Sequence, residues 1–126
     1  MKGKDFMLFG AFLGALAVAI GAFGAHWLKD LMDEKELANF KTASNYHFYH
    51  AIMLVFVGYY SNRKQKSLSL IISGYSFLVG ILLFCFSLYG YAIFNGTWMA
   101  IITPVGGLAF IIGWGALAFE VVKSKI

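Results

Sequence analysis

The sequence predicts an all-α membrane protein with four transmembrane helices in an up-down bundle, forming one domain over residues 1–126. Composition is the first observation: 60% of the residues are hydrophobic and 13% are charged, whereas soluble domains are about 45–50% apolar and about 25% charged. Second, four stretches with almost no charge are each long enough to cross a bilayer core about 30 Å thick. Third, short polar connections separate them, and short connections make neighbouring helices antiparallel.

Residues 6–25 form the first predicted span and carry no charge. Lys2 and Lys4 precede them, as basic residues precede the core of a secretory signal peptide, but such a core is about 7–15 residues long. We therefore expect a retained helix. The second predicted span, residues 43–60, is also free of formal charge and contains His47 and His50.

Residues 68–94 form the third predicted span, which is long enough to cross the membrane at a tilt. This stretch contains Cys85, and a single cysteine excludes an internal disulfide framework. Residues 99–122 form the fourth predicted span, which stays uncharged as far as Glu120. Between these last two spans, the Asn95-Gly96 pair predicts a tight turn.

The connection at residues 27–42 holds seven charged residues and also apolar residues at helical spacing. This pattern predicts a short amphipathic helix lying on the outer membrane surface. Asp33 is a candidate cap for one of its turns. The apolar stripe consists of Leu28, Leu31, Met32, Leu37 and Phe40.

The distribution of basic residues predicts that both termini lie in the cytoplasm, because Lys and Arg accumulate in cytoplasmic segments. With the N-terminus inside, seven basic residues lie on the inner side and three on the outer side. The inner set is Lys2, Lys4, Arg63, Lys64, Lys66, Lys123 and Lys125, and the outer set is Lys29, Lys35 and Lys41. None of these segments has the dense clustering of a nucleic-acid-binding face, so the expected partner is the lipid bilayer and not a nucleic acid.

Small residues at spacings of three and four mark the faces through which the helices are expected to pack, because lipid provides no hydrophobic drive for helix pairing. The same stripes are compatible with a homo-oligomer seam or with a membrane protein partner. The predicted packing positions are Gly10, Gly14, Gly21 and Gly24 in the first span, and Gly106, Gly107 and Gly113 in the fourth.

In this topology the polar residues converge near the outer ends of the spans, with all three histidines at one membrane level. His47 and His50 are three residues apart and share a helix face. We expect the cluster to bind a partner, a lipid headgroup or a small ligand, or to serve only as a structural hydrogen-bond network. The candidate residues are His26, Tyr46, His47, Tyr49, His50, Ser87, Tyr89, Thr103 and Pro104.

Two alternative functions use parts of the same cluster. His26, His47 and His50 are candidate ligands for a metal such as zinc, copper, iron or nickel, or for a haem between facing helices. A small oligomeric transporter or channel is the other alternative, since broken helices build transporter sites and Pro104 interrupts the fourth span. We favour a simple kink there, and Glu120 alone would have to serve the inner side of a transport path.

An enzyme is not expected. No paired carboxylates lie within the predicted spans, and Ser87 or Thr103 beside His50 matches no nucleophile motif. The residues identify no particular cofactor.

Four segments carry a family resemblance: residues 21–26 (GAFGAH), 42–51 (TASNYHFYHA), 84–89 (FCFSLY) and 102–114 (ITPVGGLAFIIGW). In this order and spacing they resemble the small bacterial membrane proteins called domain of unknown function 423, related to eukaryotic transmembrane protein 256. The resemblance covers nearly the whole chain. It implies a four-helix protein of the bacterial plasma membrane and supplies no activity.

The chain departs from the family pattern at two places. Trp27 follows the first histidine where the family usually has glycine, and Cys85 and Phe86 stand where its third-span motif usually has serine and glycine. Phe86 in place of glycine removes a point of close packing. The residues that match the pattern are His26, Tyr46, His47, Tyr49, His50, Thr103 and Pro104.

Overall fold

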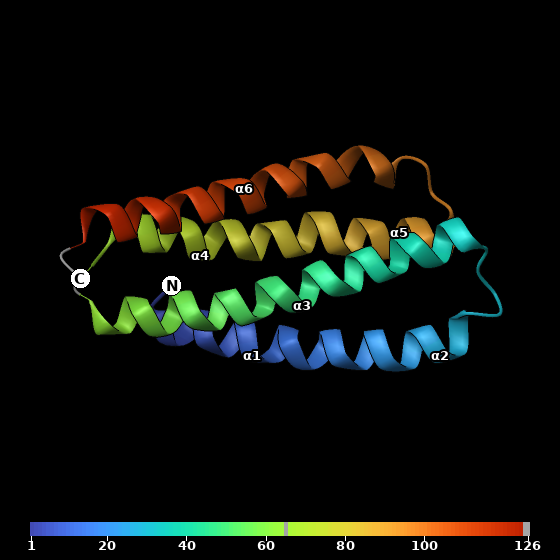
Figure 1. The fold of residues 1–126 in the computed structure, drawn as a ribbon, viewed down its shortest axis with the longest axis horizontal. Coiled ribbons are helices and arrows are strands. Elements are labelled where there is room, and N and C mark those ends of the chain that lie inside the picture. Colours follow the sequence, from blue (N-terminus) through green and yellow to red (C-terminus); the bar gives the residue numbers. More distant parts are fainter. Residues whose placement is uncertain (65, 125–126) are drawn as a thin grey trace.

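The computed structural model describes residues 1–64 and 66–124, apart from the side chain of Ala25. Lys125, counted above among the inner basic residues, lies outside the described residues. Every element is helical, and several helices join end to end into longer rods (Figure 1). The elements are α1 (Gly3–Ala19), η1 (Ile20–Gly24), α2 (Ala25–Leu28), α3 (Glu34–Arg63), α4 (Leu68–Gly80), η2 (Ile81–Cys85), α5 (Phe86–Phe94) and α6 (Met99–Lys123).

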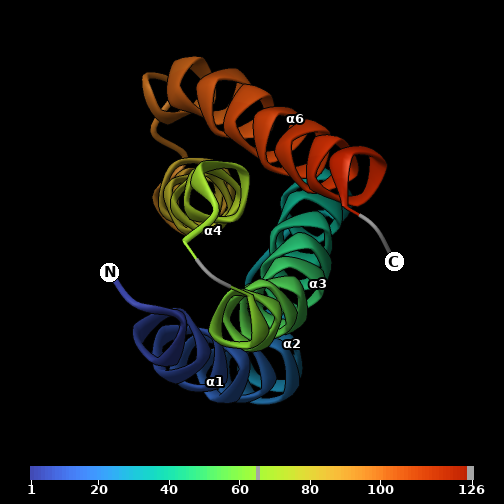
Figure 2. The same cartoon turned by 90° about the vertical axis from the view of Figure 1, so that its left-hand side faces the viewer.

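The rods lie side by side along the long axis of the molecule (Figure 1). Both termini and the α3–α4 connection lie at one end, and the α2–α3 and α5–α6 connections lie at the other. Viewed from the end, α3 and α4 lie between α1 and α6 (Figure 2). The main contacts are those of α1 with α3 and of α4 with α6, and α3 also contacts α4, η2 and α5.

Three of the rods are long and apolar enough to cross a membrane: Gly3–Leu28, Leu68–Phe94 and Met99–Lys123. The predicted second span, residues 43–60, does not reach this level of hydropathy within α3. The reason is its composition, since this stretch contains two histidines, one asparagine and four tyrosines. Its place between α1 and the other rods buries His47 and His50.

The separate surface helix predicted within residues 27–42 is not what the structure shows. Residues 34–42 are instead the first turns of α3, which runs without interruption to Arg63. Asp33 caps this helix: its carboxylate accepts from Glu36 N at 2.8 Å, and Glu36 Oε1 accepts from Asp33 N at 3.1 Å. This reciprocal capping box satisfies two otherwise unpaired backbone donors and fixes the start of α3 nine residues before the predicted span.

Glycines permit the closest approaches between rods. A Cβ on Gly10 would lie 2.8 Å from Val55 N in α3, and one on Gly113 would lie 2.7 Å from the Phe77 ring. Gly106 packs even more tightly, directly against the backbone of Phe84. Gly14 and Gly107 are looser, since a Cβ there would meet only ordinary contacts at 3.9 Å and 3.7 Å.

The segments η1 and η2 are π-helical turns within the first and third rods, and the sequence reading did not anticipate them. A π-helical turn inserts an extra residue and rotates the helix face that follows by about 100°, since an α-helix advances 3.6 residues per turn. The segment η2 contains Phe84 and Cys85 and packs on α6, next to the close approach at Gly106. By contrast, α6 continues as an α-helix across Pro104, so residues 99–123 contain no unwound segment.

Candidate functional site

The three histidines lie at different depths in the bundle, which corrects the prediction of one membrane level. His26 is exposed on α2, at the end of the first rod. His47 lies beside Leu13 of the same rod, so His26 is about 20 Å further along the axis at 1.5 Å per residue. His50 stacks on Phe110, near the middle of α6. The error arose from starting the second span at residue 43, whereas α3 begins at Glu34.

His47 is fully buried between α1 and α5. Its Nδ1 lies 2.9 Å from the Tyr89 hydroxyl, and the Phe86 ring meets it edge-on at 5.6 Å between ring centroids. Its Nε2 forms no hydrogen bond with a described residue, although the Leu13 carbonyl of α1 lies beside the ring. Phe86, which stands where the family pattern has glycine, therefore packs directly against this histidine.

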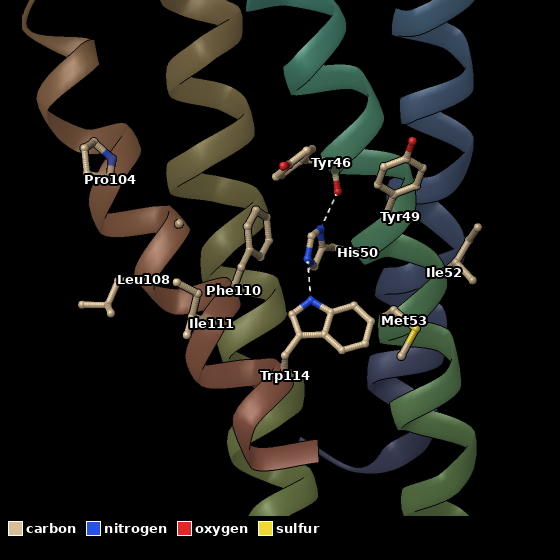
Figure 3. Close-up of a pocket in the computed structure, with 11 residues that line it drawn as sticks. Tyr46, Tyr49, His50, Ile52, Met53, Pro104, Leu108, Phe110, Ile111 and Trp114 are labelled. Atoms are coloured by element: carbon tan, nitrogen blue, oxygen red, sulfur yellow. Dashed lines mark hydrogen bonds between the residues drawn. The ribbon is translucent and has the colours of Figure 1, made fainter. Parts of the chain in front are cut away.

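His50 connects α3 to α6 and uses both of its ring nitrogens. Nδ1 lies 2.7 Å from the Tyr46 carbonyl oxygen, and Nε2 lies 3.1 Å from Trp114 Nε1 (Figure 3). An indole nitrogen is only a donor and a carbonyl is only an acceptor. The imidazole is therefore neutral, with its proton on Nδ1, and its ring stacks on Phe110 with 3.6 Å between centroids.

A groove of about 990 Å³ opens beside this pair, between α3 and α6 (Figure 3). Aromatic rings and apolar side chains line it, and its few polar groups belong to tyrosine, histidine and tryptophan. Its α3 wall consists of Tyr46, Tyr49, His50, Ile52 and Met53, and its α6 wall of Pro104, Gly107, Leu108, Phe110, Ile111 and Trp114. Such a lining, apolar with a few convergent polar groups, is typical of small-molecule sites.

Ser87 and Thr103 form a second polar contact between rods, joining α5 to α6. Their hydroxyl oxygens are 2.6 Å apart, the Phe84 carbonyl lies 3.0 Å from Ser87 Oγ, and the Met99 carbonyl lies 3.3 Å from Thr103 Oγ1. Each hydroxyl has one proton, so one hydroxyl donates to the other and the second donates to its own backbone carbonyl. The carbonyl that Pro104 leaves without its helical donor is that of Ala100. The Ser87–Thr103 bond fastens the N-terminal part of α6 to α5 beside the groove.

The candidate residues thus separate into distinct places. Tyr46, Tyr49, His50 and Pro104 line the groove, His47 pairs with Tyr89, Ser87 pairs with Thr103, and His26 stands apart. In the part of the chain that the structure describes, no three His, Cys, Asp or Glu side chains are grouped so as to hold a metal ion. A metal site built from all three histidines would need a rearrangement of about 20 Å for His26.

Glu120 forms the centre of a polar cluster at the end of the molecule that holds the termini. It is 2% exposed, and it pairs with Lys64 at 3.5 Å and Lys123 at 3.3 Å. Ser67, the N-cap of α4, also donates to it. A hydrogen bond with the Tyr60 side chain, reinforced by Glu120, raises the pKa of Lys64 above its ordinary value. The cluster ties α3, α4 and α6 together through Glu120.

The sequence reading missed Phe110 and Trp114, the two α6 residues that contact His50. They are four residues apart and therefore share a helix face. That spacing was visible in the sequence, and Trp114 closed one of the segments that carried the family resemblance. Nothing in the spacing showed that this face meets α3, because that depends on how α6 crosses the bundle.

These features define a class: a polytopic α-helical membrane protein with a neutral histidine–tryptophan pair inside its apolar layer. Residues 20–107 match the family described as "Protein of unknown function (DUF423)", and the chain belongs to this family. The family resemblance expected from the four segments is thereby confirmed.

Relatives of similar length match along almost the whole chain. A UPF0382 membrane protein of Haemophilus influenzae is 40% identical over 125 residues, which cover 99% of this chain and 98% of the relative. The UPF0382 membrane protein YwdK of Bacillus subtilis is 38% identical over 120 residues, covering 95% and 98%. The UPF0382 inner membrane protein YgdD of Escherichia coli is 30% identical over 125 residues, covering 99% and 95%. No solved structure matches the chain.

Proposed function

We propose that this protein is a non-enzymatic binding protein of the bacterial plasma membrane, which holds a membrane-soluble molecule in the groove between α3 and α6. The observation that carries the proposal is the His50–Trp114 pair at the edge of that groove. Polar residues at membrane depth are costly, so they mark functional sites. Here the pair is half-open to the groove, since Trp114 is 44% exposed while His50 is 6% exposed.

The membrane topology that goes with this function has four spans running up and down. They are the three apolar rods and, in addition, α3, which comes second in the chain. Its contacts with α1, α4, η2 and α5 accompany the burial of its two histidines, and polar residues that face the bundle interior are tolerated better than those facing lipid. The end that holds the termini carries Lys2, Lys4, Arg63, Lys64, Lys66 and Lys123 among the described residues. By the positive-inside rule this end is cytoplasmic.

Reporter fusions test this topology. A fusion in the connection between α3 and α4 is expected to report a cytoplasmic position, and one between α2 and α3 a position outside. The opposite pair of results would invert the protein and place the end that holds the termini outside.

Two glycines of α6 provide a matched test of the groove. A Cβ on Gly107 would meet the Phe84 ring at 3.7 Å, so Gly107→Leu fits the helix but places its branched end in the groove. Gly115 has nothing within 4 Å of its Cβ position and does not line the groove, so Gly115→Leu adds the same side chain elsewhere. Mass spectrometry of the gently purified proteins then identifies the small molecules that each retains.

We expect one membrane-soluble molecule to accompany the wild type and Gly115→Leu near one per chain, and to fall at least tenfold in Gly107→Leu. The same lipid profile in all three proteins would refute a binding function for the groove. Loss of a second protein copy from Gly107→Leu alone, with no small molecule involved, would instead identify the groove as a contact between copies.

A further inference from the structure

The groove contains no charged side chain among the described residues that line it. His50 adds no charge, because it accepts a hydrogen bond from Trp114 at Nε2 and donates to the Tyr46 carbonyl from Nδ1. Phosphate and carboxylate groups are recognised through cations and charge-assisted hydrogen bonds. The groove therefore does not match the headgroup of an anionic lipid, and its lining favours an uncharged molecule.

Three of the polar side chains that line the groove carry a hydrogen-bond donor there: Tyr46, Tyr49 and Trp114. The indole of Trp114 is only a donor, and its present acceptor is the His50 imidazole. The Tyr46 hydroxyl forms no hydrogen bond with another described residue, and its ring stacks on Phe84 with 5.0 Å between centroids. A donor left unsatisfied in hydrocarbon is costly, so the Tyr46 hydroxyl matches a ligand that brings an acceptor oxygen. The Trp114 indole can donate to the same ligand if it leaves His50.

The shape of the groove favours a ring. Its volume of about 990 Å³ is close to the upper limit of typical small-molecule sites. Aromatic side chains occupy much of the lining: Tyr46, Tyr49, His50, Phe110 and Trp114. Aromatic walls of this kind bind planar rings by offset stacking, and the adaptable thioether of Met53 extends the same surface.

Resting on the proposed function, we propose that the ligand is an uncharged, ring-bearing, membrane-soluble carbonyl compound of the quinone type. Its ring lies in the groove beside Tyr46 and Trp114, and its carbonyl oxygens accept from the Tyr46 hydroxyl and from the Trp114 indole. When the indole turns to the ligand, His50 Nε2 is released as an acceptor. The inference concerns binding alone, with no transfer of electrons.

Matched probes test this inference in nanodiscs of neutral phosphatidylcholine. The first probe is a naphthoquinone with one short prenyl chain, the second is naphthalene with the same chain, and the third is phosphatidylglycerol. Probe retained by Gly107→Leu nanodiscs measures simple partitioning into lipid and is subtracted. Gly115→Leu serves as the control that keeps the groove.

We expect the naphthoquinone to bind the wild type and Gly115→Leu at least tenfold more tightly than the naphthalene. Tyr46→Phe and Trp114→Phe keep a ring but remove a donor, so each is expected to weaken naphthoquinone binding about fivefold to tenfold. Neither variant should change naphthalene binding.

Equal binding of the two ring probes, or binding unchanged in both phenylalanine variants, would overturn the carbonyl assignment while leaving a groove that binds apolar molecules. Preferential retention of phosphatidylglycerol would overturn it in favour of a lipid. If no probe exceeds the Gly107→Leu background, the inference fails, and the molecules retained by the purified wild type decide the proposed function separately.

Discussion

His47 and His50 are three residues apart on α3, yet their surroundings differ in kind. His47 is enclosed between α1 and α5, with one bonded nitrogen and the other without a partner among the described residues. His50 has both nitrogens bonded and lies beside an open groove. His47 packs in the core of the bundle, whereas His50 lines the groove and is bonded to Trp114 of α6.

The difference shows that a polar residue inside a membrane helix has no single meaning. A short rotation around α3 separates the packing position of His47, which stability measurements test, from the position of His50, whose proposed binding role ligand measurements test. Substitutions at His47 and its partner should therefore change mainly stability, whereas substitutions at His50 and its partner should also change ligand binding.

His47→Ala is expected to produce the largest loss of stability. It removes a fully buried ring from between α1 and α5 and leaves the Tyr89 hydroxyl without its partner. Lost packing and the unpaired hydroxyl together cost about 2–4 kcal/mol. Reversible unfolding in mixed detergent micelles measures this change.

His26→Ala is the matched control, because the same side chain is removed from an exposed position. It should change stability by less than about 0.5 kcal/mol. If the two variants unfold alike, His47 is not a core residue and the contrast with His50 disappears.

His50→Ala should cost less, about 1–2 kcal/mol, because the space it leaves adjoins the groove, where other molecules can enter. It loses the stacking on Phe110 and leaves the Trp114 indole without its acceptor. The same unfolding measurement applies, together with ligand retention as for Gly107→Leu. A cost equal to that of His47→Ala, with retention unchanged, would make His50 a second core residue.

The sequence supported the helical class, the membrane location and the family more securely than the depth of the site. The seven charges of residues 27–42 led to a predicted surface segment, whereas the spacing of Asp33 and Glu36 is that of a capping box and marks the true start of α3. With that start, His50 lies 16 residues into the helix, about 24 Å along its axis. The spacing of Asp33 and Glu36 therefore predicts the depth of His50, although the charges around it suggested a surface segment.

No local sequence pattern predicts that Trp114 is the partner of His50. A π-helical turn such as η2 rotates the rest of its rod by about 100°, so a face followed along residues 68–94 by simple periodicity ends on the wrong side. The crossing of α6 depends on close approaches such as Gly106 against the Phe84 backbone. Those contacts, and not the spacing of polar residues, bring Trp114 to His50.

Tyr89→Phe is expected to have a smaller effect on the His47 side, about 1 kcal/mol. The ring that packs against Phe40 and Phe86 is kept, and only the hydroxyl bonded to His47 Nδ1 is removed. Hydrogen bonds between membrane helices are worth about 0.6 kcal/mol on average and at most about 1.7. Unfolding of Tyr89→Phe, His47→Ala and the double variant gives the coupling between the two side chains, and a coupling near zero would mean that the bond does not hold α5 to α3.

Trp114→Phe is expected to have the smallest effect on stability, about 0.5 kcal/mol, since a ring remains against Phe77 and only the bond to His50 is lost. His50 Nε2 then loses its donor and can accept a hydrogen bond from a ligand in the groove. Binding selectivity should therefore change more than stability: ligands that bring a donor gain affinity, and ligands that bring a carbonyl lose it. Parallel unfolding and binding measurements on this one variant separate the two effects. A large loss of stability with unchanged selectivity would assign the His50–Trp114 pair to the packing of α6, as the His47–Tyr89 pair belongs to the packing of α5.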